Sequence, residues 1–200
     1  MEIRTLEVAG FEPAMRAMRN PKNSHSKNDT HGKNIGPDDT ELSLKLQKAG
    51  PEHCKHLRQI VVWFDITAPL TFHKQLDTYR FGVEKISTST MHKLMSRKLT
   101  ADDFEPCNVD CYGERLLETI DYLNELIEAY NKEEDQDEKK RLWEYAIQIL
   151  PESFLQTRTV MMSYAALRNI VNQRKGHKLR NWEQFIDWAH TLPNSWMILE

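Results

Sequence analysis

Hydrophobic and polar positions at the start of the chain predict a strand, a helix and a second, buried strand. Residues 2–8 alternate loosely between polar and apolar side chains, which is typical of a short strand. Residues 11–19 can form a helix. Residues 60–66 are apolar and rich in β-branched side chains, a composition that favours a buried strand.

A polar connection separates these elements. Residues 20–39 are rich in Asn, Ser, Lys, Asp and Gly, so we expect a long loop, of a kind that is usually mobile or functional in compact domains. Asp38 or Asp39 can then cap a helix that runs to Ala49 and is closed by Gly50. Three side chains of this helix are expected to be partly buried: Leu42, Leu44 and Leu46.

The segment after the buried strand predicts a helix and then a turn. Pro69 suits the first position of a helix, where its missing N–H costs nothing. This helix is expected to run through Gln75 towards Arg80 until Gly82 breaks it. Residues 87–90 read Ser-Thr-Ser-Thr, which is poorly suited to a helix interior, so we expect a turn that feeds a new helix.

The second half of the chain predicts helices throughout. From Leu116 to Tyr130 the apolar side chains recur at intervals of three and four residues, as in an amphipathic helix. Three more segments are expected to be helical: residues 142–149, 160–174 and 182–189. We therefore predict one α+β domain over residues 1–200, with a small antiparallel sheet packed with helices and a helical C-terminal half.

Composition excludes several classes of protein. The chain has 200 residues, and its formal net charge of -3 gives no global reason to expect nucleic-acid binding. The longest apolar run, residues 60–64, is too short to span a bilayer, and the N-terminus lacks a secretory signature. Three cysteines cannot form a complete set of disulfides within one chain, so we expect a reduced, cytoplasmic setting.

Charge is unevenly distributed along the chain. Residues 101–138 hold 14 acidic side chains against two basic ones, whereas five basic residues crowd the window 168–180. Such runs are typical of solvated helix faces, which is our interpretation of the acidic stretch. A polynucleotide-binding protein would use the basic residues near the N-terminus, which are Arg16, Arg19, Lys22, Lys27 and Lys33. No aromatic side chains interleave with them, so nucleic acid is not an expected partner.

Metal and nucleotide motifs are weak or missing. Cys107 and Cys111 form a Cys-x-x-x-Cys pair, but a structural zinc site needs four ligands and no second pair has a matching spacing. The sequence has no His-Glu-x-x-His, no Gly-x-Gly-x-x-Gly and no Gly-x-x-x-x-Gly-Lys-Ser/Thr segment. We therefore expect no bound metal, and any phosphate site must use side chains and helix termini.

Two windows hold side chains of the types that bind phosphate. The first joins Gln75 and Arg80 to a run of hydroxyls and a histidine, namely Ser87, Thr88, Ser89, Thr90 and His92. Arginine offers a planar fork of donors to a phosphate, and hydroxyls at a helix start add further donors. The second window holds Asn169 and Arg174. Capping and surface charge are an alternative explanation of both windows.

In the order of these windows the chain resembles the flavin-dependent thymidylate synthases. The family has a strand followed by Ala-Pro, which here is Ala68-Pro69. Gln75 falls on a family glutamine, and Arg80 falls on the last arginine of the family's Arg-His-Arg. Thr88 falls on the second serine of the segment that follows.

A later family helix reads Asn-x-Arg-x-Leu-x-Asn-Phe-x-x-x-Arg. Leu167, Asn169 and Arg174 have the spacing of the Leu, the second Asn and the last Arg of this motif. The resemblance covers residues 50–180 in order, although its single motifs are degenerate. It strengthens the α+β prediction, because these elements follow one another as they do in the family.

The resemblance implies a reaction and a set of site residues. Members of the family methylate dUMP with FAD, a reduced nicotinamide cofactor such as NADPH, and methylenetetrahydrofolate, in a homotetramer with nucleotide sites between subunits. The substrate-binding residues that it implies are Gln75, Arg80, Ser87, Thr88, Ser89, His92 and Arg174. The cofactor-binding residues that it implies are His53, Tyr79 and Asn169.

Several positions depart from the family pattern. Thr78 and Tyr79 stand where the family has two FAD-contacting residues, and Ser163 and Ala165 replace its Asn and Arg. Thr90 stands where the family places an arginine for the substrate phosphate. A hydroxyl donates one neutral hydrogen bond, which is weaker than a bidentate charged pair, so we expect weak dUMP affinity and reduced synthase activity.

Two functions remain open on the sequence. The chain is either a divergent thymidylate synthase-type methyltransferase acting on dUMP or a related nucleotide, or a non-catalytic, phage-associated nucleotide-binding or structural module on the same scaffold. The stretch Ser87–His92 is similar to one in uncharacterised bacteriophage and prophage proteins of this group. Bound FAD would favour the enzyme.

Overall fold

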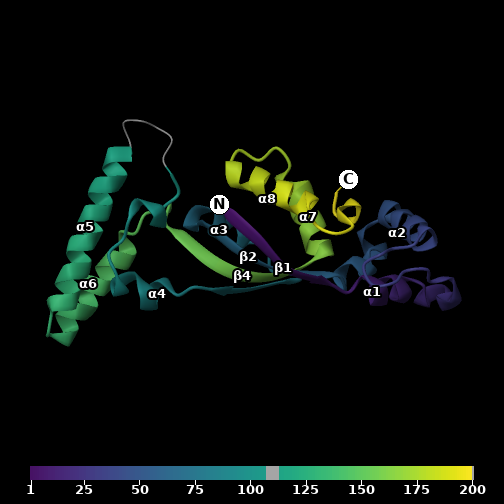
Figure 1. Cartoon of the computed structure of the whole chain (residues 1–200), viewed down its shortest axis with the longest axis horizontal. Helices are drawn as coiled ribbons and strands as arrows, with labels where there is room; N and C mark the ends of the chain where they lie inside the picture. The colour runs from purple at the N-terminus through teal and green to yellow at the C-terminus, as the bar shows by residue number, and fades with distance from the viewer. Residues whose placement is uncertain (107–112, 200) are drawn as a thin grey trace. The chain divides into compact units, whose positions relative to one another are not determined.

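The computed structural model describes residues 1–106 and 113–199, which form two compact units (Figure 1). One, here called the cleft unit, comprises Glu2–Ile66, Asp77–Ile86 and Thr159–Glu200. The other, here called the hairpin unit, comprises residue 1, Thr67–Leu76 and Ser87–Arg158. Cys107 and Cys111, the two cysteines of the weak metal motif, lie outside the described residues.

The secondary structure mixes strands and helices in chain order. The strands are β1 (Glu2–Ala9), β2 (Val61–Pro69), β3 (Val83–Ser87) and β4 (Leu155–Ser163). The helices are α1 (Phe11–Met18), α2 (Pro37–Ala49), α3 (Leu70–Leu76), α4 (Thr90–Lys93), α5 (Gly113–Lys132), α6 (Gln136–Gln148), α7 (Tyr164–Arg174) and α8 (Arg180–His190). Short 3-10 turns include η3 (Pro51–His53) and η4 (Lys55–Arg58).

A four-stranded antiparallel sheet in the order β1-β2-β4-β3 confirms the predicted α+β class. Its register is visible in the cleft unit. The Arg4 guanidinium donates across to Asp65 at 2.8 Å, and the backbone N–H of Ser163 donates to the Gly82 carbonyl at 2.8 Å. The predicted strands over residues 2–8 and 60–66 are confirmed, although β2 extends to Pro69.

Two strands contradict the sequence predictions. β4 occupies residues 155–163, so the second half is not helical throughout, and the helix expected over 160–174 begins only at Tyr164. The reason is a period of two: Val160 and Met162 are fully buried, whereas Met161 between them is only partly buried and Thr159 before them is exposed. β3 was missed because it is only five residues long, Val83–Ser87, and begins directly after a glycine turn.

The predicted helix after Pro69 is shorter than expected. α3 ends at Leu76, well before Arg80, and Gly82 then adopts a left-handed φ of 69° just before β3. The turn-then-helix prediction for residues 87–90 is confirmed in part: Ser87 still belongs to β3, but Ser89 accepts the backbone N–H of His92 and caps α4, which begins at Thr90. The expected helix over 182–189 is also confirmed, as part of α8.

Aromatic side chains form the core of the cleft unit, where α8 covers the β2 face that carries Phe64. The Phe64 ring lies 4.3 Å from the Trp188 ring and 6.1 Å from the Phe185 ring, measured between centroids. Phe11 of α1 meets Tyr164 at the start of α7 edge-on, with 5.4 Å between centroids. These rings are almost fully buried, so they supply much of the apolar area that holds the sheet, α1, α7 and α8 together.

Helix α2 corrects two expectations. Its N-cap is Gly36, not Asp38 or Asp39, and Pro37 takes the first position. Leu42 and Leu46 are partly buried as predicted, but Leu44 is exposed, and the buried residues of the helix are Asp39, Ser43 and Gln47. These polar positions recur every four residues, so a hydrophobic pattern could not reveal the buried face.

Buried Asp39 instead anchors the polar connection before α2. The Arg19 guanidinium donates to Asp39 Oδ1 at 2.6 Å, and the Thr30 hydroxyl donates to Asp39 Oδ2 at 2.6 Å. All three side chains are buried. The Asp29 carboxylate accepts the backbone N–H groups of Asp38 and Asp39, which are free donors of the first turn of α2. The predicted long loop is therefore tied to α1 and α2.

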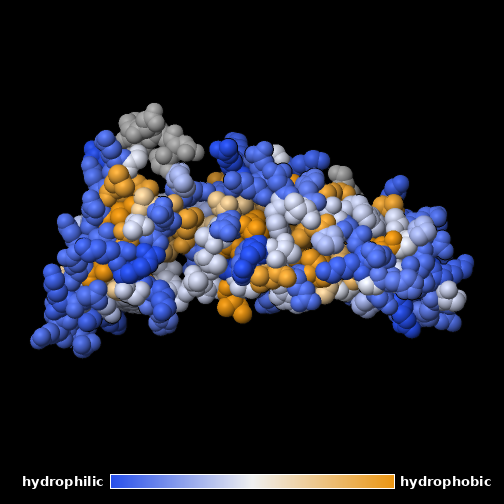
Figure 2. All heavy atoms as spheres, viewed as in Figure 1, coloured by the Kyte–Doolittle hydropathy of each residue, from blue (hydrophilic) through white to orange (hydrophobic). Residues whose placement is uncertain are grey.

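The hairpin unit is built on α5 and α6, which run side by side (Figure 1). The predicted amphipathic helix over 116–130 is confirmed as part of α5. The hairpin's apolar cluster consists of Leu94, Met95, Leu99, Phe104, Ile120, Leu123, Leu126, Ile127 and Ala146. Figure 2 shows mostly hydrophilic side chains over the outer part of this hairpin. Within the described residues, no helix has the length and apolar character needed to cross a membrane.

Candidate functional site

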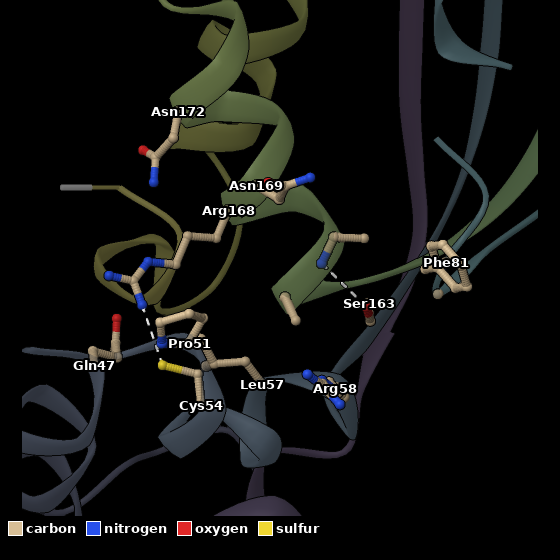
Figure 3. Close-up of a pocket in the computed structure, with 13 residues that line it drawn as sticks. Gln47, Pro51, Cys54, Leu57, Arg58, Phe81, Ser163, Arg168, Asn169 and Asn172 are labelled. Atoms are coloured by element: carbon tan, nitrogen blue, oxygen red, sulfur yellow. Dashed lines mark hydrogen bonds between the residues drawn. The ribbon is translucent and has the colours of Figure 1, made fainter. Parts of the chain in front are cut away.

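The cleft unit contains a cleft of about 850 Å³ (Figure 3). Three separate parts of the sequence line it. The 3-10 turns after α2 contribute Cys54 and Arg58, the turn before β3 contributes Phe81, and α7 contributes Arg168 and Asn169. η4 packs against both α1 and α7, which brings these distant segments to one place.

A glycine and a serine shape one wall of this cleft. The Ser163 hydroxyl accepts the backbone N–H of Ala166 at 3.2 Å and so caps α7. The Ser163 backbone N–H donates to the Gly82 carbonyl at 2.8 Å. A Cβ on Gly82 would lie 2.6 Å from the Ser163 hydroxyl oxygen, and its φ is 69°. Only glycine fits this position without a shift of the wall, because other residues disfavour the left-handed region and would clash.

Two guanidinium groups give the cleft its charge. Arg168 and Arg58 both line it, and none of its described lining residues carries a carboxylate. Figure 3 shows Arg168 reaching across to Cys54, whose Sγ lies 3.5 Å from Arg168 Nη1. The Cys54 thiol itself lies 3.3 Å from the Gly50 carbonyl, to which it donates. Cations without acidic neighbours in the lining make this cleft attractive to an anionic ligand.

A buried polar network supports the cleft from the side of α2. Ser43 Oγ lies 2.9 Å from His56 Nε2, and the Gln47 amide donates to Ser43 Oγ at 3.1 Å. Burial, with a smaller contribution from the charge of Arg168, lowers the pKa of His56 from 6.5 to about 4. The imidazole is therefore neutral at pH 7, so it adds no charge to the cleft wall.

A second, smaller cleft of about 250 Å³ adjoins the first. Tyr79, Arg80 and Gln173 line it, and it shares Phe81 and Asn169 with the larger cleft. None of its described lining residues is acidic. The two clefts together offer an apolar and amide surface with two guanidinium groups in the larger cleft and one in the smaller, which suits a ligand that combines a flat ring with phosphate.

Arg174 is held against two aromatic rings. Its guanidinium carbon lies 4.7 Å from the Trp182 ring centroid and 5.4 Å from that of Tyr79. Its Nε donates to the Tyr79 hydroxyl at 2.8 Å, and that hydroxyl donates to Gln173 Oε1 at 3.1 Å. Cation–π contact and hydrogen bonding fix the Arg174 guanidinium beside the smaller cleft's Tyr79.

The structure gathers some of the sequence-predicted residues and separates others. Tyr79, Arg80, Asn169 and Arg174 come together in the cleft unit. His53 lies in η3 beside Glu52, with 3.5 Å between Nε2 and Oε1, and it is not among the residues that line either cleft. The remaining candidates belong to the hairpin unit, and they are Gln75, Ser87, Thr88, Ser89 and His92.

The hydroxyl run in the hairpin unit is largely engaged in internal hydrogen bonds. Thr88 donates both its backbone N–H and its hydroxyl to the Thr157 carbonyl, at 2.9 and 3.2 Å. Ser89 caps α4. The amide of Gln156, which is 9% exposed, donates to the Thr88 carbonyl at 3.0 Å and to the Thr90 hydroxyl at 3.2 Å. These bonds hold the segment in one shape and occupy the donors of Thr88, whereas the Ser89 and Thr90 hydroxyls act in them as acceptors.

Sequence analysis did not identify four residues that matter most to the cleft. Cys54 and Phe81 belong to no motif, an ungapped match to the family only puts Arg58 at its Glu-His pair, and Arg168 is one of the five basic residues of the window 168–180. The available signal was helical spacing, since Ala165, Arg168 and Asn172 recur at intervals of three and four residues, as side chains on one face of a helix do. Arg168 and Cys54 are 114 residues apart, so only the fold reveals their contact.

Comparisons with known proteins identify the fold. No protein-family model matches the sequence, and no curated protein matches it. The structure is similar to the crystal structure of flavin-dependent thymidylate synthase ThyX from Helicobacter pylori complexed with FAD and dUMP. The TM-score is 0.82 at 16% identity, over 100% of this chain and 98% of that one. A second structure of Helicobacter pylori ThyX with FAD and dUMP gives a TM-score of 0.81 at 16% identity, over 100% and 97% of the two chains. The chain therefore has the ThyX fold, as the resemblance of its motifs implied.

Proposed function

We propose that this protein is a divergent flavin-dependent thymidylate synthase-like protein that binds FAD and methylates dUMP or a related nucleotide. The observation that carries the proposal is a cleft, on the ThyX fold, that is lined by Arg58 and Arg168 and by no carboxylate among its described lining residues. An anionic dinucleotide matches that charge. The neighbours of this fold are complexed with FAD and dUMP.

The residues of the larger cleft fit FAD. Arg58 and Arg168 would hold its phosphates, because guanidinium groups bind phosphate with charged, bidentate hydrogen bonds. Leu57 and Ala166 offer apolar surface to a ring, and the Asn169 amide offers a donor and an acceptor to its polar edge. When bound, FAD supplies the electron-transfer chemistry, while this chain binds and orients the reactants.

The smaller cleft is the proposed place for the substrate's charged end. Arg80 lines it, and Tyr79 fixes Arg174 beside it. The proposed roles of Gln75, Ser87 and His92 in the hairpin unit rest on the resemblance alone. Methylenetetrahydrofolate and NADPH are the co-reactants that the proposed methylation requires.

One observation favours the alternative, a non-catalytic nucleotide-binding or structural module. Thr90 replaces the family's phosphate-binding arginine, and its hydroxyl accepts the amide of Gln156. Thr88 is engaged with the neighbouring strand. The Thr88 donors are therefore used within the segment, and the Thr90 hydroxyl offers a phosphate only a neutral hydrogen bond in place of a bidentate charged pair, which leaves this window with weak means of holding a phosphate. We expect the dUMP affinity and the synthase rate to be low.

The oligomer, the cellular setting and the source also belong to this proposal. We propose a cytoplasmic homotetramer of a phage- or prophage-type protein. The homotetramer rests on the resemblance to the family alone. Light scattering at micromolar concentration tests the tetramer, and a monomer would contradict it.

The function is tested in two stages. Purified protein is titrated with FAD, and binding is followed by flavin absorbance and fluorescence. Saturable FAD binding supports a flavoprotein, and its absence would overturn the proposal. A thymidine-requiring bacterial strain is then transformed with the gene. Growth without thymidine supports the synthase, whereas FAD binding without growth supports the non-catalytic module.

A further inference from the structure

Phe81 occupies an unusual position for a large apolar side chain. It is 97% exposed, yet it is a lining residue of both clefts, so it stands where they adjoin (Figure 3). A ring so exposed contributes almost nothing to the core, because little of its area leaves water on folding. Its position at the junction of two clefts is therefore better explained by what it meets there than by packing.

The backbone holds Phe81 in place. Gly82, the next residue, has a φ of 69° and comes within hydrogen-bonding distance of Ser163, whose N–H donates to the Gly82 carbonyl at 2.8 Å. Ser163 is itself fixed as the cap of α7. The ring is thus presented by a constrained turn rather than by a flexible loop, so binding a ligand there requires little ordering of the backbone.

The charges around Phe81 indicate the chemistry of the partner. Arg80 precedes it in the smaller cleft, and Arg58 and Arg168 line the larger one. An exposed aromatic face beside guanidinium groups matches a planar nitrogen heterocycle joined to phosphate, since the ring stacks and the phosphate pairs with the cation. A phosphate without a ring would leave Phe81 unused.

We propose that Phe81 is the stacking platform for the planar ring of a nucleotide bound in these clefts, and that it determines selectivity for ring-bearing ligands. The inference rests on the proposed function, because it assigns a residue to the site proposed for FAD. Stacking of a base on an aromatic side chain implies that its loss weakens binding by about ten- to a hundredfold. The isoalloxazine and the adenine of FAD share this chemistry, and different probes separate them.

The experiment compares Phe81→Ala, Phe81→Tyr and Ile86→Ala with the wild type. Ile86 is the matched control, because it is also a highly exposed apolar residue of the cleft unit but lines neither cleft. FAD, FMN and ADP are titrated by calorimetry, and molar mass is measured by light scattering. Since Phe81 is exposed, all variants are expected to keep the wild-type melting temperature.

The proposal predicts that Phe81→Ala weakens FAD binding by about ten- to a hundredfold, while Phe81→Tyr and Ile86→Ala bind within about twofold of wild type. Loss of FMN affinity in Phe81→Ala identifies the flavin as the stacked ring, and loss of ADP affinity identifies adenine. Unchanged FAD affinity in Phe81→Ala would overturn the inference and leave the proposed function standing. A smaller oligomer in Phe81→Ala would also overturn it, by making Phe81 an interface residue. A wild type that binds none of the probes would overturn both.

Discussion

The cleft unit and the hairpin unit place their polar groups differently. In the hairpin unit, cations pair with carboxylates at the surface, as in Arg97 with Asp103, Lys98 with Glu128 and Arg141 with Glu138. Its buried cluster is apolar. The cleft unit buries Asp39 with Arg19 and Ser43 with His56, while Arg58 and Arg168 line a cleft without a lining carboxylate.

This difference distinguishes charged side chains that form ion pairs at the surface from charged side chains that line a candidate binding site. Arg97 raises no functional question, because the Asp103 side chain hydrogen-bonds it and raises the pKa of its guanidinium. Arg168 lines the larger cleft and donates to the Cys54 thiol at 3.5 Å. We therefore expect substitutions in the cleft unit to change stability, pH dependence and binding, whereas surface charges of the hairpin unit should change little.

The largest expected effect is on the buried ion pair. Arg19→Ala leaves the Asp39 carboxylate buried without its guanidinium partner, since Asp39 is 0% exposed. Loss of one partner of such a pair costs about 3–5 kcal/mol of unfolding free energy. Urea denaturation measures it. The matched hairpin-unit variant, Arg97→Ala, should lose no more than about 1 kcal/mol, and equal losses would erase the contrast between the units.

The next effect is the pH dependence that His56 introduces. The pKa of His56 is about 4 in the folded protein, against an ordinary value of 6.5, so the unfolded chain binds more protons between these values. The contribution of neutral His56 to the unfolding free energy is therefore fully present above pH 6.5. It is lost as the pH falls towards 4, by about 3 kcal/mol in total.

The measurement is the unfolding free energy from pH 7.5 to 4 for wild type and His56→Gln. The variant keeps a polar group for Ser43 but has nothing to protonate, so its curve should be flatter over this range. Parallel curves for the two proteins would show that His56 is not the group responsible.

A smaller loss of stability is expected from a substitution at Gly82, and a substitution at Gly32 serves as its control. Gly82→Ala forces a side chain into a left-handed φ and against the Ser163 hydroxyl, at a cost of about 1–3 kcal/mol together with weaker FAD binding. Gly32 also has a positive φ, of 61°, but a Cβ there would meet nothing within 4 Å. Gly32→Ala should cost about 1 kcal/mol and leave FAD binding unchanged. Equal binding in the two variants would show that the Gly82 wall does not shape the site.

Local patterns predicted the elements in which apolar side chains repeat at one spacing throughout. They missed the elements in which that spacing changes or in which the buried side chains are polar. α5 was predicted because Leu116 to Tyr130 repeats at helical spacing in a segment with one buried face. β4 was missed because its strand joins α7 without a break, with Ser163 as both the last strand residue and the cap. α2 buries polar residues, so its inner face carries no hydrophobic signal.

The site was predicted less well than the fold. Arg80 and Asn169, which the resemblance singled out through motifs with defined spacing, line the same small cleft. Arg58 and Arg168 lie far apart in sequence and become neighbours only because η4 packs on α7. The hydroxyl run looked like a phosphate site, but the Gln156 amide of β4 donates to the Thr88 carbonyl and the Thr90 hydroxyl. A hydrogen-bond partner on another strand cannot be predicted from the sequence of one segment.

The most direct test of the account is the FAD dissociation constant of wild type, Arg168→Gln and Arg97→Gln, measured by calorimetry at one ionic strength. Loss of a charged hydrogen bond to phosphate predicts at least about tenfold weaker binding for Arg168→Gln. Arg97→Gln, which removes a surface cation of the hairpin unit, should stay within about twofold of wild type. Equal affinity in Arg168→Gln and wild type would contradict the claim that the cleft of this unit holds the cofactor's phosphates.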